Sequence, residues 1–589
     1  MYETNNPPTD LESADLLSKL LNEKKAAREI QERKHQDWND NYELYRNKVK
    51  TNRLTQRQAV NIPLMKETIK TVLSKIDDAP NVDWMEKSGD ETKELIYQEV
   101  WNDSFKRNNL EQLDVLDKKN VLLYGLSTKK LNIAKKGVVI DVLDTFDVVF
   151  DPMMSILDVE TARFIVHQNI FKPLRDILAD DRYSKEGRDK LKDWVMTEKG
   201  MIQSGKNKEE WEKKMERIRS MGVEHSEFAL FAGGDVVVNI TEHYTNIWDE
   251  KKKKFVRTVC VYADDTIELL KEPLSELIGM DMWPFVVWCE DPETNDIYPD
   301  GVADLVRTPN KILNVWFSQA VENRTLQNFQ MHWYDGTVQG YTPQTYEPGP
   351  GRMLPAPGDP NKTIMPVQIN GLDETFNAIN FLTNIVERGT GATAIEKGQA
   401  EKGSQTLGEV EILVGKAMER SLSMQKFYRG SWYQVAKKWD AIMQGNSFEK
   451  FSLYKTGRGG KVYEKIVYNK DWKSDAGYEP TVSSTSEQES ESIKSLQKWN
   501  FVLQQFPTNT VLRKLGQQRQ LQVLDLTPSE LEEVEEEENR LEQVAQEQAQ
   551  LETQMAQQGL QPPQQQEQAQ VPQVEDIGEI ESLLGELTA

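Results

Sequence analysis

The sequence has few cysteines, no long apolar run and no recognisable leader. Only Cys260 and Cys289 occur among 589 residues, and both lie in apolar, strand-like runs. We therefore expect buried free thiols in a reducing compartment rather than a disulfide framework. No apolar run approaches the roughly 18 residues that cross a bilayer, so no membrane association is expected. The N-terminus, MYETNNPPTDLESADL, has neither the basic region nor the apolar core of a secretory signal.

The sequence also lacks the residue patterns of common catalytic and metal sites. The histidines show no H-x₃-H spacing, the cysteines form no C-x₂-C pair, and no G-x-S-x-G nucleophile elbow occurs. Acidic pairs, Asp147/Asp151 and Asp264-Asp265, fall where strands give way to turns, so solvated carboxylates are the simpler interpretation. The five histidines are His35, His167, His225, His243 and His332. We expect no catalytic residue, no metal, no cofactor and no enzymatic activity.

Residues 200–207, GMIQSGKN, come close to a phosphate-binding P-loop. Gly200, Gly205 and Lys206 fit G-x-x-x-x-G-K-[ST], but Asn207 lacks the hydroxyl that ligates Mg²⁺. The preceding KLKDWVMTEK is charged and helical in period, whereas a P-loop follows a buried strand. Downstream, no apolar strand ends in the Asp that would complete a magnesium site. Nucleotide hydrolysis is therefore not expected.

Acidic residues outnumber basic ones, 96 Asp and Glu against 72 Lys and Arg, which bears on nucleic acid as a ligand. The net charge is −24, and residues 530–589 contain 16 acidic residues against one basic residue, a net of −15. The other 529 residues therefore carry −24 + 15 = −9. A protein that grips nucleic acid neutralises phosphates with a basic face. Either DNA is not a ligand, or it is handled without tight binding.

The first half of the chain predicts helices followed by strands. At 589 residues it should contain several packed units. Helices are predicted over residues 10–50, 62–76 and 90–123, with Trp38, Tyr42 and Tyr45 on one face of the first and Gly125 as C-cap of the third. Residues 173–221 read as helical again. Short β-branched runs predict strands within 130–137, 138–144, 147–152, 162–171, 235–249, 253–264 and 282–291. Up to residue 298 the pattern is that of an α+β domain with a mixed sheet.

The second half predicts two helices around an irregular insert. One helix begins at Thr308-Pro309 and ends near Gln330, and another covers residues 373–387. Between Gly340 and Pro366 seven prolines and four glycines exclude helix, so the ends of the insert must lie close together. A glycine-dotted loop, residues 390–404, precedes a long helix over 406–443 and a hairpin over 451–469.

The C-terminal region is helical and then low in complexity. Helices are predicted over residues 491–526, and residues 541–570 contain 13 glutamines, a composition typical of disorder. An apolar stripe returns at the end and predicts either a peptide that docks on a partner or a frayed helix without a role. The stripe consists of Ile577, Ile580, Leu583, Leu584 and Leu587.

This succession of elements resembles the portal proteins of tailed bacteriophages, the head-to-tail connector ring at one capsid vertex. Three stretches carry the resemblance: WNDNYELYRN before NIPLMKETIKTVLSKI, then LDKKNVLLYG before FDVVFDP, and above all DIYPDGVADLVRTPNKILNVWFSQAVENR. The last is similar to the Gly-x-x-Asp and proline-led helix with which portals enter their stem. The similarity of order covers residues 30–525.

The resemblance implies a portal-like α+β fold, predominantly helical, with eight regions. They are N-terminal helices and a mixed-sheet wing (1–305), two stem helices (306–330 and 372–389), a clip (331–371), a tunnel loop (390–404), a return to the wing (405–486), crown helices (487–527) and an acidic, Gln-rich tail (528–589). The implied site residues are Thr390, Lys397 and Lys402 in the tunnel loop, Lys311, Arg324 and Arg388 in the stem, and Tyr341, Tyr346 and Arg352 in the clip.

The function implied is a DNA channel for packaging, retention, tail attachment and ejection. The implied partners are further copies of the chain in a ring, typically of twelve, the terminase large subunit, head–tail adaptor or tail proteins, and the major capsid and scaffolding proteins. Double-stranded DNA would pass without sequence specificity, and the ring would assemble in the host cytoplasm and reside in the virion. Three alternatives stay open: another virion ring such as a head–tail adaptor, a nucleic-acid-processing enzyme, and a cytosolic scaffold.

Overall fold

The computed structural model describes residues 13–48, 60–76, 80–134, 137–197, 214, 237–249, 253–328, 332–334, 364–366, 373–390, 407–448, 450–456 and 462–484. The chain divides into two compact units, Met1–Lys455 with Glu464–Glu489, and Thr456–Tyr463 with Ser490–Ala589. Almost every described residue belongs to the first unit, which combines helices and sheets and is α+β as expected. The P-loop-like stretch, the crown and the tail lie outside the described residues.

The helices follow the apolar periodicity of the sequence, with one correction. The segment expected as one helix over 90–123 is two helices, because Asn109 adopts a left-handed φ of 50° between them. Gly125, with φ 83°, ends the second as predicted, and its N–H donates to Val121 O at 2.8 Å. The helices are α1 (Ser13–Tyr45), α2 (Leu64–Lys75), α3 (Glu91–Arg107), α4 (Leu110–Tyr124), α5 (Leu174–Ala179), α6 (Lys185–Thr197), α9 (Leu274–Leu277), α10 (Val302–Asn328), α12 (Asp373–Thr390), α13 (Leu407–Gly445) and α14 (Asn469–Trp472).

The two larger sheets are antiparallel throughout, whereas a mixed sheet was expected. Short connections link three of the six neighbouring strand pairs, β2-β3, β6-β7 and β7-β8, and such short links favour antiparallel pairing. The five-stranded sheet has the order β4-β5-β6-β7-β8 and the three-stranded sheet β3-β2-β9. Their strands are β2 (Leu126–Ala134), β3 (Gly137–Leu143), β4 (Val148–Phe150), β5 (Phe164–Pro173), β6 (Val237–Asp249), β7 (Lys254–Ala263), β8 (Ile267–Pro273) and β9 (Phe285–Cys289). Cys260 and Cys289 are buried free thiols, as predicted.

A small sheet joins two segments that are far apart in the sequence. Strand β1 (Pro80–Glu86) pairs antiparallel with β14 (Tyr478–Ser484). Beside it, β12 (Phe451–Thr456) and β13 (Val462–Val467) form the predicted hairpin. Aromatic rings from α3, α13 and β14 surround Trp84 of β1; Tyr97 and Tyr478 stack with ring centroids 3.9 Å apart. This pairing makes the α13–β14 region part of the same core as the N-terminal helices.

Strand β2 buries one lysine on each of its faces. Lys129 and Lys130 are consecutive, so their side chains leave opposite faces of the three-stranded sheet. Lys130 pairs with Glu242 of β6 in the five-stranded sheet, and Lys129 pairs with Asp117 of α4. Because a buried cation needs a partner in contact, these two pairs fix which face of β2 meets which neighbour.

Helix α13 is held on this body by a buried polar cluster. Ser431 Oγ of α13 accepts from Lys129 Nζ at 3.2 Å, and Tyr428 OH donates to Asp114 Oδ1 at 2.6 Å. Asp114 also pairs with Lys118 at 2.6 Å, and none of the four charged side chains of the cluster is more than 3% exposed. Charges in this state require specific partners, so the cluster fixes the orientation of α13 on α4 and β2.

Candidate functional site: a two-helix arm and its anchor

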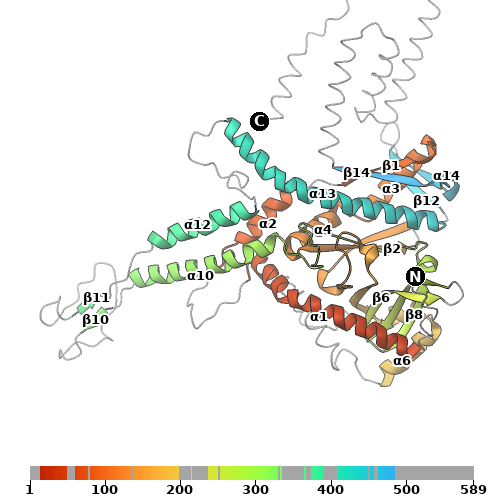
Figure 1. Ribbon diagram of the computed structural model, residues 1–589, viewed down its shortest axis with the longest axis horizontal. Helices are drawn as coiled ribbons and strands as arrows, with labels where there is room; N and C mark the ends of the chain where they lie inside the picture. The colour runs from red at the N-terminus through yellow and green to blue at the C-terminus, as the bar shows by residue number, and fades with distance from the viewer. Residues whose placement is uncertain are drawn as a thin grey trace, which may run out of the picture. The chain divides into compact units, whose positions relative to one another are not determined.

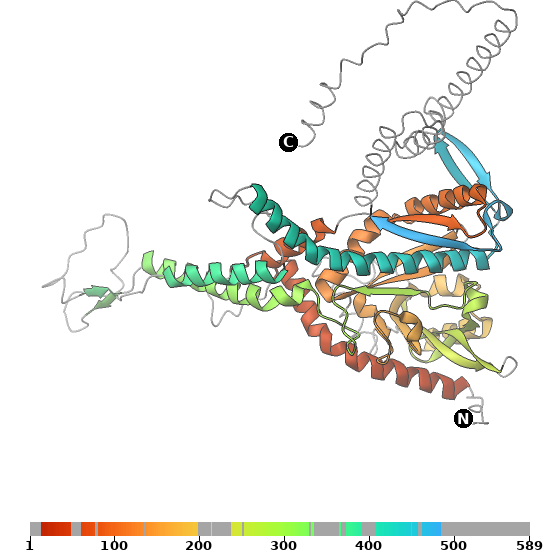
Figure 2. The same ribbon diagram turned by 45° about the horizontal axis from the view of Figure 1, so that its top comes forward.

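Helices α10 and α12 form what we call the arm. They lie side by side in both views (Figures 1 and 2), and the chain runs out along α10 and returns along α12. At their outer end β10 (His332–Tyr334) pairs antiparallel with β11 (Ile364–Pro366). Of the insert expected over 331–371, only these two strands are described. The helix–insert–helix arrangement expected from the proline and glycine pattern is therefore present.

Helix α10 begins earlier than its sequence suggested. The expected start was Thr308, with Pro309 in the first turn, but the helix begins at Val302 and Pro309 lies inside it. Asp304 stabilises the earlier start, because its carboxylate accepts from the N–H of Gly301 at 2.8 Å. Proline lacks an N–H, so Pro309 leaves the carbonyl of Leu305 without its intrahelical donor.

Two glycines let α10 start directly against the end of α4. A Cβ at Gly301 would lie 2.7 Å from Val121 O and 2.8 Å from Gly125 N. A Cβ at Gly125 would lie 1.9 Å from Pro299 O, and its φ of 83° already favours glycine. The Gly301 expected at the stem entrance therefore has a steric role: it allows close approach of two backbones.

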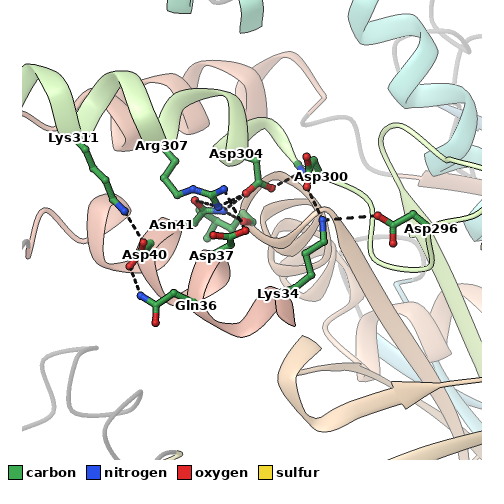
Figure 3. Close-up of polar contacts among 12 residues, drawn as sticks. Lys34, Gln36, Asp37, Asp40, Asn41, Asp296, Asp300, Asp304, Arg307 and Lys311 are labelled. Carbon is green, nitrogen blue, oxygen red and sulfur yellow. Dashed lines mark hydrogen bonds and ion pairs between the residues drawn. The ribbon is translucent and has the colours of Figure 1, made fainter. Parts of the chain in front are cut away.

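Charged contacts tie the base of α10 to α1 (Figure 3). Lys34 of α1 donates to Asp300 Oδ1 at 2.7 Å, and Lys311 of α10 donates to Asp40 Oδ2 of α1 at 2.5 Å. Burial lowers the pKa of Lys34, but Asp300 and neighbouring carboxylates outweigh it, so the pKa is raised above 10.5. Both pairs are partly exposed and each contributes about 0–1 kcal/mol.

Between these pairs lies a less exposed network around Arg307. Its guanidinium contacts Asp304 at 2.5 Å and Asp37 of α1 at 3.3 Å. Asn41 of α1 donates to Asp304 Oδ1 at 3.0 Å and, through the same amide, to Leu123 O at 3.0 Å. Asn41 is fully buried, so α1, α4 and α10 meet at one polar point.

A second row of contacts holds α10 from another side. Met65 N, Ile62 N and Val60 N donate to Asn310 Oδ1 (2.8 Å), Asn314 Oδ1 (2.8 Å) and Ser318 Oγ (3.0 Å), respectively. The three acceptors lie at i, i+4 and i+8, on one face of α10. They satisfy two backbone donors of the segment before α2 and one in the first turn of α2, where the N–H groups have no partner within the helix. The i, i+4, i+8 spacing of Asn310, Asn314 and Ser318 is visible in the sequence and indicates a polar contact along one face of this helix.

The residues assigned to the stem by resemblance do not form one cluster. Lys311 is at the base and paired with Asp40, whereas Arg324 is exposed near the outer end of α10. Arg388 is exposed near the C-terminal end of α12, and Thr390 Oγ1 donates to Val386 O at 2.8 Å. The remaining assigned residues lie outside the described part: Lys397, Lys402, Tyr341, Tyr346, Arg352, Ile577, Ile580, Leu583, Leu584 and Leu587.

The described residues contain no group of three or more His, Cys, Asp or Glu side chains arranged to hold a metal ion. Within the same residues, no helix combines the length and the hydropathy that a bilayer crossing requires.

Comparisons with known proteins give distant likenesses. No family model and no curated protein matches the sequence. The structure is similar to a chain in the virion of a native gene transfer agent (GTA) particle, with 10% identity, a TM-score of 0.33, and coverage of 81% of this chain and 93% of that chain. It is also similar to a chain in the neck of an empty GTA particle computed with C6 symmetry, with 11% identity, a TM-score of 0.29, and coverage of 73% and 84%. Both TM-scores lie below 0.5, so neither likeness carries a conclusion about function.

Proposed function

We propose that copies of this chain form a portal, the ring-shaped channel at one vertex of a phage-like capsid. The observation that carries the proposal is the arm: two adjacent helices, interrupted by an insert and anchored on an α+β body. In the proposed ring, the two helices would serve as the stem and the insert as the clip that the resemblance of the sequence implies. Residues 391–406 and then the long α13 follow α12 in the order that a tunnel loop and its helix would take.

The negative net charge of the chain favours a channel through which DNA slides over a protein that binds DNA tightly. A sliding polyanion requires a wall that does not neutralise its phosphates one by one, because about six such contacts already bind firmly. A net charge of −24, and −9 without the tail, meets this requirement. The role is structural rather than catalytic. The position of the ring at a capsid vertex implies its partners. A packaging motor would bind on the insert side and adaptor or tail proteins would bind later, while capsid and scaffolding proteins would surround the body.

Mass photometry and electron microscopy of the purified full chain test the proposal. We expect particles with a central opening and, for twelve chains of 67.9 kDa, a mass of about 815 kDa. A monomer or dimer without an opening would contradict the portal and favour a scaffold protein. A ring that assembles only on a preformed portal would favour a head–tail adaptor.

Lys397→Ala combined with Lys402→Ala tests the loop before α13. In a ring one lysine recurs in every copy and becomes a belt of charge. We expect intact rings but reduced DNA packaging or retention, measured as DNA protected from nuclease per particle. Lys271→Ala, an exposed lysine on β8, is the control. Unchanged packaging by the double variant would count against the loop assignment.

A further inference from the structure

Helix α12 carries apolar side chains on two faces. Ile379 and Val386 are buried, and Leu382 packs against the same core, so these residues form an inner row. Phe381 and Ile385 are one turn apart and form an outer row that is 65% and 42% exposed. A helix that packs on one neighbour needs only one apolar stripe. Among the described residues of a single chain, the outer row is therefore left without an apolar neighbour that buries it.

The stretch of α12 that carries the outer row contains no charged residue until Glu387 and the exposed Arg388, which follow Ile385 by two and three positions. Residues 377–386, NAINFLTNIV, contain no charged side chain, although 29% of the whole chain is charged. Asn377, Asn380 and Asn384 are exposed beside Phe381 and Ile385. Depletion of charge around an aromatic side chain is typical of the centre of a protein–protein interface.

Helix α10 presents a second exposed row of similar character. Thr308, Val315 and Gln319 are exposed at helical spacing, and Val315 is 40% exposed. The one cation in this row, Lys311, is paired with Asp40 of the same chain. The arm thus carries two different surfaces, one on each helix, that bring little net charge to a contact.

We infer that the outer row of α12 in one copy packs against the α10 row of the next copy; this inference rests on the ring proposed above. Each copy carries a net charge of −24, so contacts through charged faces would bring like charges together, whereas these rows avoid that repulsion. DNA is a poorer occupant, because residues 377–386 offer no cation for a phosphate and Arg388 alone follows one turn beyond Ile385. Two unlike rows on one arm make a heterologous contact, which repeats from copy to copy until the ring closes.

Cross-linking tests the pairing of the two rows. Because Cys260 and Cys289 are buried, cysteines introduced by Ile385→Cys and Val315→Cys are the reactive thiols of the assembled protein. A bis-maleimide that reaches about 8–10 Å, the distance between packed helices, should give a ladder of covalent multimers with the double variant and none with either single variant. Dimers from Ile385→Cys alone would show a symmetric contact and overturn the inference. Rings of the double variant that give no ladder would also overturn it.

A charge substitution tests the same contact without chemistry. Phe381→Glu should lower the fraction of assembled rings at a fixed concentration at least about tenfold, equivalent to 1.4 kcal/mol. Leu95→Glu on α3 is the matched control, because Leu95 is 67% exposed and lies away from the arm; it should leave assembly unchanged. Both variants should keep the wild-type unfolding temperature of the isolated chain.

The outcomes separate this inference from the proposed function. If the wild-type chain forms no ring, the portal proposal fails. If the wild type and Phe381→Glu form rings equally well, only the α12 contact is refuted. Intact Phe381→Glu rings that retain less DNA would refute the contact and assign the row to nucleic acid.

Discussion

Lys129 offers the sharpest test of how the body is held together. Its ammonium is 1% exposed and pairs with Asp117, which is fully buried and also accepts from Trp288 Nε1 at 2.8 Å. Replacing Lys129 by methionine keeps the volume but leaves the Asp117 carboxylate buried without its cation. Removing one partner of such a pair costs about 3–5 kcal/mol. Since 1.4 kcal/mol is a factor of ten, protection against hydrogen exchange in β2 should fall roughly 150- to 4,000-fold.

Hydrogen exchange followed by mass spectrometry of peptides covering β2 and the C-terminal half of α13 measures this loss. Adding Asp117→Asn to Lys129→Met removes both charges and keeps an acceptor for Trp288, so most of the protection should return. Lys271→Met on β8 is the control and should change stability by less than about 0.5 kcal/mol. If Lys129→Met exchanges like the wild type, or if the double variant is worse than the single one, the ionic account of this cluster is wrong.

Three further perturbations probe other parts of the molecule. Asn314→Ala leaves the Ile62 N–H without its acceptor and should lower the local free energy of unfolding by about 1–3 kcal/mol. Hydrogen exchange should then be faster in residues 60–65 alone. Faster exchange over the whole chain would contradict a local role. Gly125→Ala places a Cβ 1.9 Å from a backbone carbonyl oxygen at φ 83° and should sharply reduce soluble protein, so normal yield and unfolding temperature would show that the two backbones can separate. Burial lowers the pKa of His243 below 6.5, and the nearby Glu23 offsets this effect only in part. The neutral imidazole is therefore favoured in the folded state, so stability should be lost as the pH falls below about 6.5. His243→Asn should weaken that loss, and identical pH dependence of both proteins would exclude His243 as a cause.

Local patterns predicted most individual elements. The β-branched runs located β5, β6 and β7, and helical periodicity located α1 and α13 to within a few residues. The wrong or missing predictions concern elements whose conformation depends on a contact far away in the sequence or on a single residue. Strand β1 was missed because its partner β14 lies about 400 positions later. The break at Asn109 depends on a single left-handed residue that leaves the apolar period nearly intact.

The arm itself was predictable, but its anchor was not. Two helices around a proline-rich insert are a local pattern, whereas Asp37, which pairs with Arg307, lies on α1, 307 − 37 = 270 residues earlier. The sequence also misled at Pro309, because proline is favoured in a first turn and Thr308 is a good cap. Gly301 outweighs that preference through its close approach to α4, and Asp304 through the hydrogen bonds it accepts from Gly301 N and from Asn41 of α1.

The hydrogen bonds to Asn310, Asn314 and Ser318 hold α10 as far as Ser318 against the segment around the start of α2, whereas the part of α10 beyond Ser318 has no such contact with that segment among the described residues. The ten residues from Ser318 to Asn328 span about 15 Å at 1.5 Å per residue. A tilt of about 10° at the clamped end would move the free end by roughly 2.6 Å over that length. Small rearrangements among the side chains that grip α10 are therefore magnified at the β10–β11 tip.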